Sequence, residues 1–366
     1  MVFQDFSPFL WHNGHKGLFA FRSEPRRRRH VKQQYVCFSN KDGVSSVEKR
    51  IYKACTILLD VCAKCQRDEK ILIVTDPDSL RVAQALWDAA EGYPNKGLVM
   101  TSTQTMHGQE PTALVAAAMM EADVIFRVTK FSITSTDARR KACANGARDI
   151  NCADYDLRML ESGGLYTDFE AMGPVVDGVA QKFKGAEVRI TTPAGTDITA
   201  NIEGRANLPQ YGRSLLPGQS SSPPDIELAI GANDGTVNGV AYIDGSIPHP
   251  LLGLIKEPVR IVIEKSKVTE ISGGEQAEVL KKILSEYGNP DVYHIGELGI
   301  GLNPACELTG RMLEDEGCFG TMHFGLGDDR TFFGNNACPI HLDLVFQKPT
   351  LTVDGLTILE DGELRV

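Results

Sequence analysis

Two imidazoles and three carboxylates in the second half of the chain have the donor atoms of a metal site. The residues are Glu227, Glu297, His323, His341 and Asp343. Neutral imidazole and carboxylate oxygen together suit divalent zinc, cobalt, manganese or ferrous iron. Three carboxylates would largely balance two such ions, which could polarise a carbonyl and activate a bridging water. A single ion held by imidazole and carboxylate would instead suit non-haem iron chemistry. The spacing alone leaves both possibilities open.

The pair His341 and Asp343 must be positioned by a strand. These two polar residues alternate with Ile340, Leu342 and Leu344, and a period of two is typical of a half-buried strand. Residues two apart on a strand share one face. The pattern therefore predicts that the imidazole and the carboxylate project together, with an aliphatic face behind them.

Glycine surrounds two of the other candidates. His323 lies in the short alternating run 320–327, and Glu297 lies in the run 294–302, in which three glycines occur. Glycine lets a backbone approach a ligand or another chain segment closely. A single His or Glu in such a run is more often a hydrogen-bonded structural group, but several together favour a metal site. Glu227 follows a segment rich in serine and proline, 208–224, which is predicted to be a loop.

Composition limits the class of protein and its partners. The chain has 366 residues, 42% of them hydrophobic and 23% charged, which is typical of a soluble globular protein with room for two domains. The formal net charge of −10 argues against a nucleic-acid partner, since such proteins need a cationic surface. A small-molecule or peptide substrate is expected.

Cysteine usage and hydropathy indicate a location. Nine cysteines without regular spacing favour a reducing compartment, and the protein is expected to be cytoplasmic. Cys62 and Cys65 lie in a predicted helix over 47–66 without a second pair at zinc spacing, so they are interpreted as buried or half-buried thiols. No apolar stretch is long enough for a membrane span, and no secretory signal is evident.

Three regions follow from the patterns along the chain. Residues 1–45 are predicted to be a poorly ordered basic extension containing the run Arg26–His30. Residues 46–184 alternate helices with continuous aliphatic strands, which predicts an α/β domain with a parallel sheet. Residues 185–366 are predicted to form an α+β domain of mostly antiparallel strands that carries the metal site. Neither a dinucleotide-binding nor a triphosphate-binding glycine motif occurs.

From about Val47 onward the chain resembles the thermophilic-type aminopeptidases, a family of two-metal exopeptidases. The resemblance rests on Glu227 with the following Asn-Asp-Gly, on the Gly-Glu-Leu-Gly around Glu297, on the glycine-flanked His323, and on His341-x-Asp343. It implies that these five residues bind two ions of zinc, cobalt or manganese. It also implies that Glu297 is a candidate base, that the amino end of a peptide binds nearby, and that the subunits pair as a homodimer.

The chain departs from that family at Arg330. The peptidases carry a tyrosine seven residues after the first histidine, where this chain has Arg330. An arginine could stabilise an oxyanion but could not bind a cation. The same superfamily includes 2,5-dihydroxypyridine 5,6-dioxygenase, an iron enzyme that keeps the His-x-Asp pair and has a histidine where this chain has Glu297. Retention of Glu297, His323 and Glu227 favours the two-metal hydrolase.

The sequence therefore predicts a metal-dependent hydrolase of aminopeptidase type, with Glu297 and Arg330 as its catalytic residues. The first alternative is a non-haem Fe(II) dioxygenase that cleaves the ring of a dihydroxylated aromatic or N-heterocycle. The second alternative is a non-catalytic binding protein on the same fold.

Overall fold

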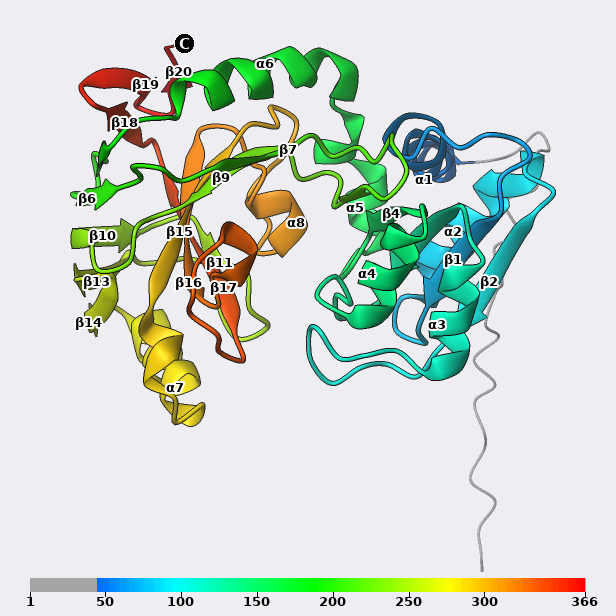
Figure 1. Cartoon of the computed structure of the whole chain (residues 1–366), viewed down its shortest axis with the longest axis horizontal. Helices are drawn as coiled ribbons and strands as arrows, with labels where there is room; N and C mark the ends of the chain where they lie inside the picture. The colour runs from blue at the N-terminus through cyan, green and yellow to red at the C-terminus, as the bar shows by residue number, and fades with distance from the viewer. Residues whose placement is uncertain (1–44, 366) are drawn as a thin grey trace, which may run out of the picture. The chain divides into compact units, whose positions relative to one another are not determined.

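The structure is a computed structural model of the chain and describes residues 45–365. The predicted basic extension, with its run Arg26–His30, lies outside the described residues except for Ser45. The described part contains one parallel sheet and two larger antiparallel sheets, whose strands alternate along the second half of the chain. Figure 1 colours the chain by residue number from blue to red. This arrangement confirms the predicted fold class, a parallel α/β region followed by a mostly antiparallel α+β region.

The parallel sheet has the strand order β2-β1-β3-β4-β8, and every pair in it is parallel. Its strands are β1 (Ile71–Thr75), β2 (Lys96–Met100), β3 (Val124–Val128), β4 (Arg148–Asn151) and β8 (Ser220–Ser221). All residues of β1 and β3 are buried, because helices cover a parallel sheet on both faces and its strands can then be continuously apolar.

Helices separate these strands and continue beyond them. They are α1 (Ser46–Ile57), the π-helical turn η1 (Leu58–Cys62), α2 (Leu80–Ala89), the 3₁₀ turn η2 (Ala90–Gly92), α3 (Ala113–Met120), α4 (Asp137–Ala144), α5 (Leu157–Glu161), the 3₁₀ turn η3 (Gly164–Tyr166) and α6 (Phe169–Lys182). Helix α1 begins with a capping box, in which Ser45 accepts from the backbone of Glu48 and Glu48 accepts from that of Ser45. The observed helical segment ends at Cys62, four residues before the end of the helix predicted over 47–66. Cys62 is buried, and Cys65 lies beyond the helix and is half-buried.

The eight-stranded sheet has the order β14-β13-β10-β6-β5-β18-β19-β20. Its strands are β5 (Glu187–Thr191), β6 (Asp197–Asn201), β10 (Asn238–Ile243), β13 (Val259–Glu264), β14 (Lys267–Ser272), β18 (Thr350–Val353), β19 (Leu356–Glu360) and β20 (Glu363–Leu364). Buried residues alternate with exposed or half-buried ones along β5, β6 and β13. This alternation indicates that one face of the sheet packs on a core and the other faces solvent.

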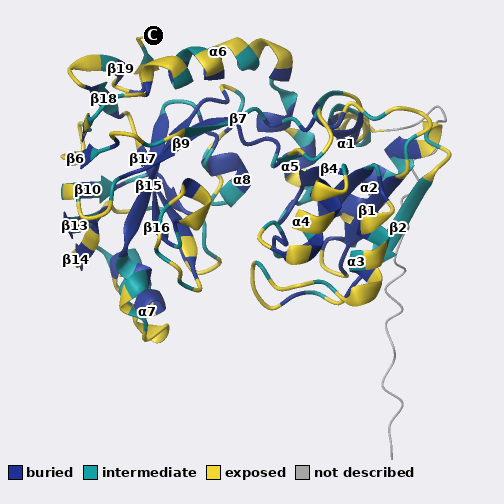
Figure 2. Ribbon diagram, viewed as in Figure 1, coloured by how far each residue is buried: buried dark blue, intermediate teal, exposed yellow. Residues whose placement is uncertain are grey.

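The seven-stranded sheet has the order β12-β11-β17-β16-β15-β9-β7. Its strands are β7 (Asn207–Gln210), β9 (Glu227–Gly231), β11 (Ser246–Ile247), β12 (Gly253–Leu254), β15 (Ile295–Gly301), β16 (Thr321–Gly327) and β17 (His341–Gln347). The remaining helical elements are α7 (Glu275–Glu286), the 3₁₀ turn η4 (Pro290–Tyr293), α8 (Met312–Asp315) and the 3₁₀ turn η5 (Arg330–Phe332). All residues of β9, β15 and β16 are buried, as the dark blue strands of Figure 2 show.

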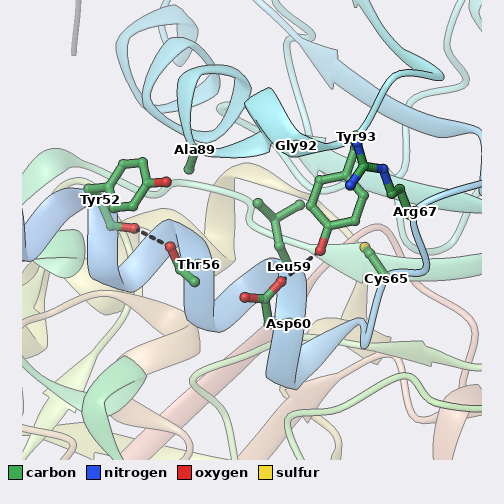
Figure 3. A pocket seen from close by; sticks show the side chains of 9 residues that line it. All are labelled: Tyr52, Thr56, Leu59, Asp60, Cys65, Arg67, Ala89, Gly92 and Tyr93. Atoms are coloured by element: carbon green, nitrogen blue, oxygen red, sulfur yellow. Dashed lines mark hydrogen bonds between the residues drawn. The ribbon is translucent and has the colours of Figure 1, made fainter. Parts of the chain in front are cut away.

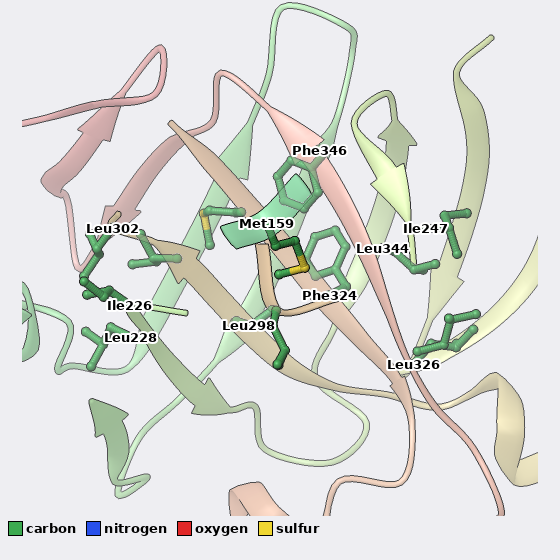
Figure 4. Close-up of a cluster of buried hydrophobic side chains, with 14 of the residues drawn as sticks. Met159, Ile226, Leu228, Ile247, Leu298, Leu302, Phe324, Leu326, Leu344 and Phe346 are labelled. Carbon is green, nitrogen blue, oxygen red and sulfur yellow. The ribbon is translucent and has the colours of Figure 1, made fainter. Parts of the chain in front are cut away.

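The two faces of this sheet differ in chemistry. Leu228, Leu298, Phe324 and Leu344 belong to the hydrophobic core, and Figure 4 shows them gathered with Phe346 on neighbouring strands. The rings of Phe324 and Phe346 have their centroids 4.8 Å apart. Because side chains alternate along a strand, the residue next to each of these apolar side chains points to the opposite face. Polar residues occupy that opposite face.

The segment 208–224 contains strand residues that the sequence did not predict. Leu208–Gln210 belong to β7, which pairs with β9 at the edge of the seven-stranded sheet. Ser220 and Ser221 form β8, which pairs with β4 in the parallel sheet. Two residues paired with a strand from far earlier in the chain give no local periodicity, and flanking prolines and glycines are typical of loops. The domain boundary between residues 184 and 185 stays a prediction. Strand β8 belongs to the parallel sheet although it comes after that boundary in the sequence.

Candidate metal centre

Four neighbouring strands bring the five candidate residues to one face of the seven-stranded sheet. Glu227 begins β9, Glu297 lies in β15, His323 lies in β16, and His341 and Asp343 lie in β17. These strands are adjacent in the order β17-β16-β15-β9. Residues from distant parts of the chain therefore become neighbours through strand pairing alone.

Every one of the five lies opposite a glycine on an adjacent strand. The cross-strand pairs are Glu227 with Gly301, Glu297 and Asp343 with Gly325, His323 with Gly299, and His341 with Gly327. Directly opposed residues of an antiparallel pair project to the same face. A Cβ at Gly299 would lie 2.0 Å from Nε2 of His323, and one at Gly325 would lie 2.3 Å from Oε2 of Glu297. Gly299 and Gly325 thus leave the space that the side chains of His323 and Glu297 occupy.

Glu297 lies at the centre of the group. Its Oε1 is 3.4 Å from Nε2 of His323, and its Oε2 is 3.0 Å from Nε2 of His341. The same nitrogen of His323 is 3.4 Å from Oε2 of Glu227, and that of His341 is 3.3 Å from Oδ1 of Asp343. Two overlapping sets result, in each of which the donor atoms lie within 4.8 Å of one another: Glu227 with Glu297 and His323, and Glu297 with His341 and Asp343.

His341 forms the accessible side of the group. About 33% of its side chain is exposed, whereas Glu297, His323 and Asp343 are buried. Nδ1 of His341 is 2.7 Å from the carbonyl oxygen of Asp328. A carbonyl only accepts, so Nδ1 carries the proton and donates it, while Nε2 faces the carboxylates. Donation from the other ring nitrogen is the usual way in which proteins orient a metal-binding histidine.

Burial and charge act against each other on the titratable groups. Burial raises the pKa of the Glu227 carboxyl well above its usual value. Burial opposes charge on His323 as well, but the carboxylates of Glu297 and Glu227 outweigh it and raise the imidazole pKa to about 9. At Asp343 the effect of burial is outweighed by the neighbouring His341, and the pKa is lowered. The closely spaced carboxylates therefore favour positive charge within the group, whether from a protonated imidazole or from a bound cation.

The donor set fits a divalent cation. Oε2 of Glu227 and Oε2 of Glu297 are buried, and although imidazole nitrogens lie nearby, neither oxygen accepts a hydrogen bond of normal geometry from the described residues. Buried acceptors in native proteins are normally satisfied. A cation held by Glu297 with either set of neighbours would satisfy its Oε2 and would reduce the repulsion among the carboxylates. Imidazole nitrogen with carboxylate oxygen is a donor set of the kind that ferrous iron and similar divalent ions take.

Two further carboxylic acids near the group were missed from the sequence. Asp225 is buried, its Oδ1 has no partner among the described residues, and burial together with Glu297 and Asp343 raises its pKa. Glu316, just after α8, hydrogen-bonds Asp343, and burial raises its pKa well above the usual value. Asp225 could have been found, because it precedes Glu227 by two residues, the spacing that links His341 to Asp343. Glu316 has no comparable signal, since only tertiary packing brings it near.

Arg330 lies apart from the five residues. Its guanidinium pairs with Asp328, with 2.6 Å between Nη2 and Oδ2, and 64% of its side chain is exposed. The predicted role in stabilising an oxyanion therefore has no contact with the group to support it, and it stays a prediction.

A cavity of about 390 Å³ lies in the α/β region, away from this group. Figure 3 shows the hydroxyl of Tyr93 donating to Asp60 across it, over 2.7 Å. Its lining residues are Tyr52, Thr56, Leu59, Asp60, Cys65, Arg67, Ala89, Gly92 and Tyr93. None of the five residues of the metal centre belongs to this lining.

The fold and the site together define a class of enzyme in which an antiparallel sheet presents imidazoles and carboxylates suited to a divalent cation. The family model described as 2,5-dihydroxypyridine 5,6-dioxygenase matches residues 50–366, and the chain belongs to this family.

One curated relative and two solved structures are similar to this chain. The 2,5-dihydroxypyridine 5,6-dioxygenase of Pseudomonas putida KT2440 is 26% identical over 187 residues, which cover 48% of this chain and 53% of the relative. The match thus spans about half the length of that curated protein. The solved structure of 2,5-dihydroxypyridine dioxygenase from the same organism has a TM-score of 0.71 at 20% identity, covering 88% of this chain and 98% of that one. Wild-type AmpT from Thermus thermophilus has a TM-score of 0.64 at 13% identity, covering 87% and 100%.

The predicted aminopeptidase-type hydrolase is wrong. The family match over 50–366 and the curated relative both support the first alternative, the dioxygenase. The likeness to AmpT extends over most of the chain, but at 13% identity it shows only that the two proteins share a fold. The physical reason for the error is that Glu227, Glu297 and His323 are not specific to hydrolysis. Imidazole and carboxylate ligands also bind iron, so the ligand types do not distinguish the two reactions. The prediction of a zinc-dependent peptidase is therefore wrong as well.

Proposed function

We propose that the protein is a metal-dependent dioxygenase that opens the ring of a dihydroxylated N-heteroaromatic compound of the 2,5-dihydroxypyridine type. The observation that carries the proposal is the family match over 50–366, which includes all five residues of the metal centre. The group of imidazoles and carboxylates on the sheet supports it, because ferrous oxygenases use such donors with open coordination positions.

Glu297, His341 and Asp343 would hold the iron. Their donor atoms lie within 4.8 Å of one another, and His341 is the partly exposed member. A catalytic ion needs positions left open for substrate, and this set has an accessible side. The set of Glu227, Glu297 and His323 is fully buried. When bound, ferrous iron would supply the electron transfer that lets dioxygen react with an electron-rich ring.

The surrounding residues have distinct parts in this proposal. His341 keeps its proton on Nδ1 by donating to Asp328, which leaves Nε2 directed at the metal position. Nε2 of His323 lies 3.4 Å from carboxylate oxygens of both Glu227 and Glu297, so its imidazole would connect Glu227 to the ligand Glu297. The ring of Phe332 stacks on His341 with centroids 5.8 Å apart. It therefore covers one face of the imidazole.

Metal content and oxygen consumption test the proposal together. We expect protein purified anaerobically without chelator to carry iron, and to consume oxygen with 2,5-dihydroxypyridine but not with aminoacyl amides. The double change His341→Ala with Asp343→Ala should remove the iron and also the increase in melting temperature that metal gives, because a bound ligand stabilises the native state by mass action.

The exposed Glu270 offers a matched control. It pairs with Arg260 on the surface of the other antiparallel sheet, and Glu270→Ala should keep iron content and oxygen consumption. Iron-loaded protein that consumed no oxygen with any dihydroxylated pyridine would count against the proposal. Equal metal content in the double variant and the parent would exclude this ligand set.

A further inference from the structure

The loop between β16 and β17 forms the support of His341. It runs over 328–340 and begins with Asp328, whose carbonyl oxygen accepts from Nδ1 of His341. Phe332 in the same loop stacks on the imidazole. The orientation of His341 therefore depends on where this loop is held.

Asp329 fixes the loop to the strand region beneath it. Its Oδ2 lies 3.0 Å from Nε2 of His294, and both side chains are buried. Its Oδ1 accepts from the backbone N–H of Asn336 over 2.8 Å. The side-chain amide of Asn336 in turn donates to the carbonyl of Gly327 over 2.7 Å. The carboxylate of Asp329 is thus the point where the loop closes on itself and attaches to His294.

Close packing leaves Asp329 little freedom. A Cβ at Gly296 would lie 2.4 Å from Cβ of Asp329, and one at Gly334 would lie 2.0 Å from its Cγ. Gly296 directly precedes Glu297, so the same carboxylate packs against the strand that carries the central residue of the metal group. Burial would raise the pKa of the Asp329 carboxyl, but its hydrogen bond with His294 and other nearby interactions together outweigh burial and lower that pKa.

We propose that His294 and Asp329 are a positioning pair for His341: they hold the Asp328 carbonyl where it accepts from Nδ1, so that Nε2 faces Glu297 and Asp343. The inference deepens the proposed function, since it rests on His341 being a metal ligand. Neither residue is among the five of the metal group, and their effect on the metal passes through the loop.

Asp329→Asn is the most direct test, because it keeps the size of the side chain and removes the charge that pairs with His294. Two quantities are measured on the full chain. One is the Nδ1–H resonance of His341 in histidine-labelled protein, assigned by its loss in His341→Gln. The other is the affinity for ferrous iron, measured by anaerobic titration. We expect the parent to show an Nδ1–H resonance protected from exchange. Asp329→Asn should lose that protection and bind iron on the order of 10-fold to 100-fold more weakly.

Asp234→Asn is the matched control. Asp234 is the second carboxylate near His294, at 3.8 Å from Nδ1, but 87% of its side chain is exposed. This variant should keep both the protected resonance and the iron affinity of the parent. His294→Gln gives a second test from the other side of the pair and should behave as Asp329→Asn does.

The outcomes separate this inference from the proposed function. If Asp329→Asn lowers the melting temperature but leaves the resonance and the iron affinity unchanged, the positioning role is wrong and the pair is only structural. If the parent itself binds no iron, the proposed function fails. Loss of the protected resonance in Asp329→Asn, with its retention in Asp234→Asn, would still support the positioning of His341.

Discussion

Arg127 and Asp149 form a fully buried ion pair in the parallel sheet, with two hydrogen bonds of 2.6 and 2.8 Å. Arg127 lies in β3 and Asp149 in β4, and the hydroxyl of Ser220 in β8 donates to Asp149 over 2.5 Å. The pair therefore connects the short strand β8, which the sequence did not reveal, to the centre of the sheet.

Removing one charge of this pair should strongly destabilise the protein. Asp149→Asn would leave the buried guanidinium without a counter-charge, and such changes typically cost about 3–5 kcal/mol. Denaturant unfolding would measure the loss of free energy of unfolding. The control is Asp197→Asn in the exposed pair Arg189–Asp197, which should leave the unfolding midpoint unchanged. Equal effects of the two changes would contradict the structural role assigned to Asp149.

At the scale of elements, the seven-stranded sheet is specialised by its glycines. Adjacent strands alternate polar side chains with glycines at opposed positions, as Glu297 and Gly325 show. The opposite face is continuously apolar and packs in the core. One set of strands thus provides both a stable core and a polar group, because the pleat separates the two faces.

An added methyl group on the polar face should disturb the metal centre. A Cβ at Gly325 would lie 2.3 Å from Oε2 of Glu297 and 2.9 Å from Cε1 of His341, so Gly325→Ala must displace both side chains. We expect iron affinity to fall by on the order of 10-fold or more, as for other disturbances around metal ligands. Gly97→Ala in β2 is the control, because a Cβ there would meet only Leu72, at 3.9 Å. Unchanged iron affinity in Gly325→Ala would rule out this account of the glycines.

At the scale of the whole described chain, Glu314 connects the antiparallel region with the α/β region. Its Oε1 accepts from the backbone N–H of Gly164 over 2.8 Å. The side chain of Asn303 adds a hydrogen bond to the carbonyl of the same glycine, over 3.1 Å.

No helix among residues 45–365 is long and apolar enough to span a membrane. The predicted homodimer and cytoplasmic location stay predictions.

The protonation of Glu314 should make stability depend on pH. Burial raises the pKa of its carboxyl from 4.5 to about 7, so between these values the folded protein holds a proton that the unfolded chain has released. The stability linked to this proton is present below pH 4.5 and is lost as the pH rises through 7. Relative to Glu314→Gln, which does not titrate, the parent should lose stability on the order of 3 kcal/mol between pH 5 and 8.

Unfolding curves of the two proteins at several pH values would check this expectation. The exposed Glu278, which pairs with Lys281 on α7, provides a control: Glu278→Gln should follow the parent at every pH. A constant stability difference between the parent and Glu314→Gln across this range would show that Glu314 does not titrate there.

The sequence by itself determined the local features. The alternation around His341 and Asp343 predicted a strand that presents both residues on one face, and β17 has that arrangement. Continuous apolar runs predicted the buried parallel strands β1 and β3. These features follow from the conformational and packing preferences of neighbouring residues, which the period of the sequence records.

Only the tertiary structure decided which residues meet. Strand pairing placed Glu227 and His323 beside Glu297, brought Asp225 and Glu316 to the same group, and left Arg330 outside it with Asp328. It also joined β8 to the parallel sheet. Contacts of this kind connect segments far apart in the chain, and their energies come from packing and burial that no local pattern records. The choice between hydrolysis and ring cleavage was likewise beyond the ligand types, because the same imidazoles and carboxylates bind the metals of both reactions.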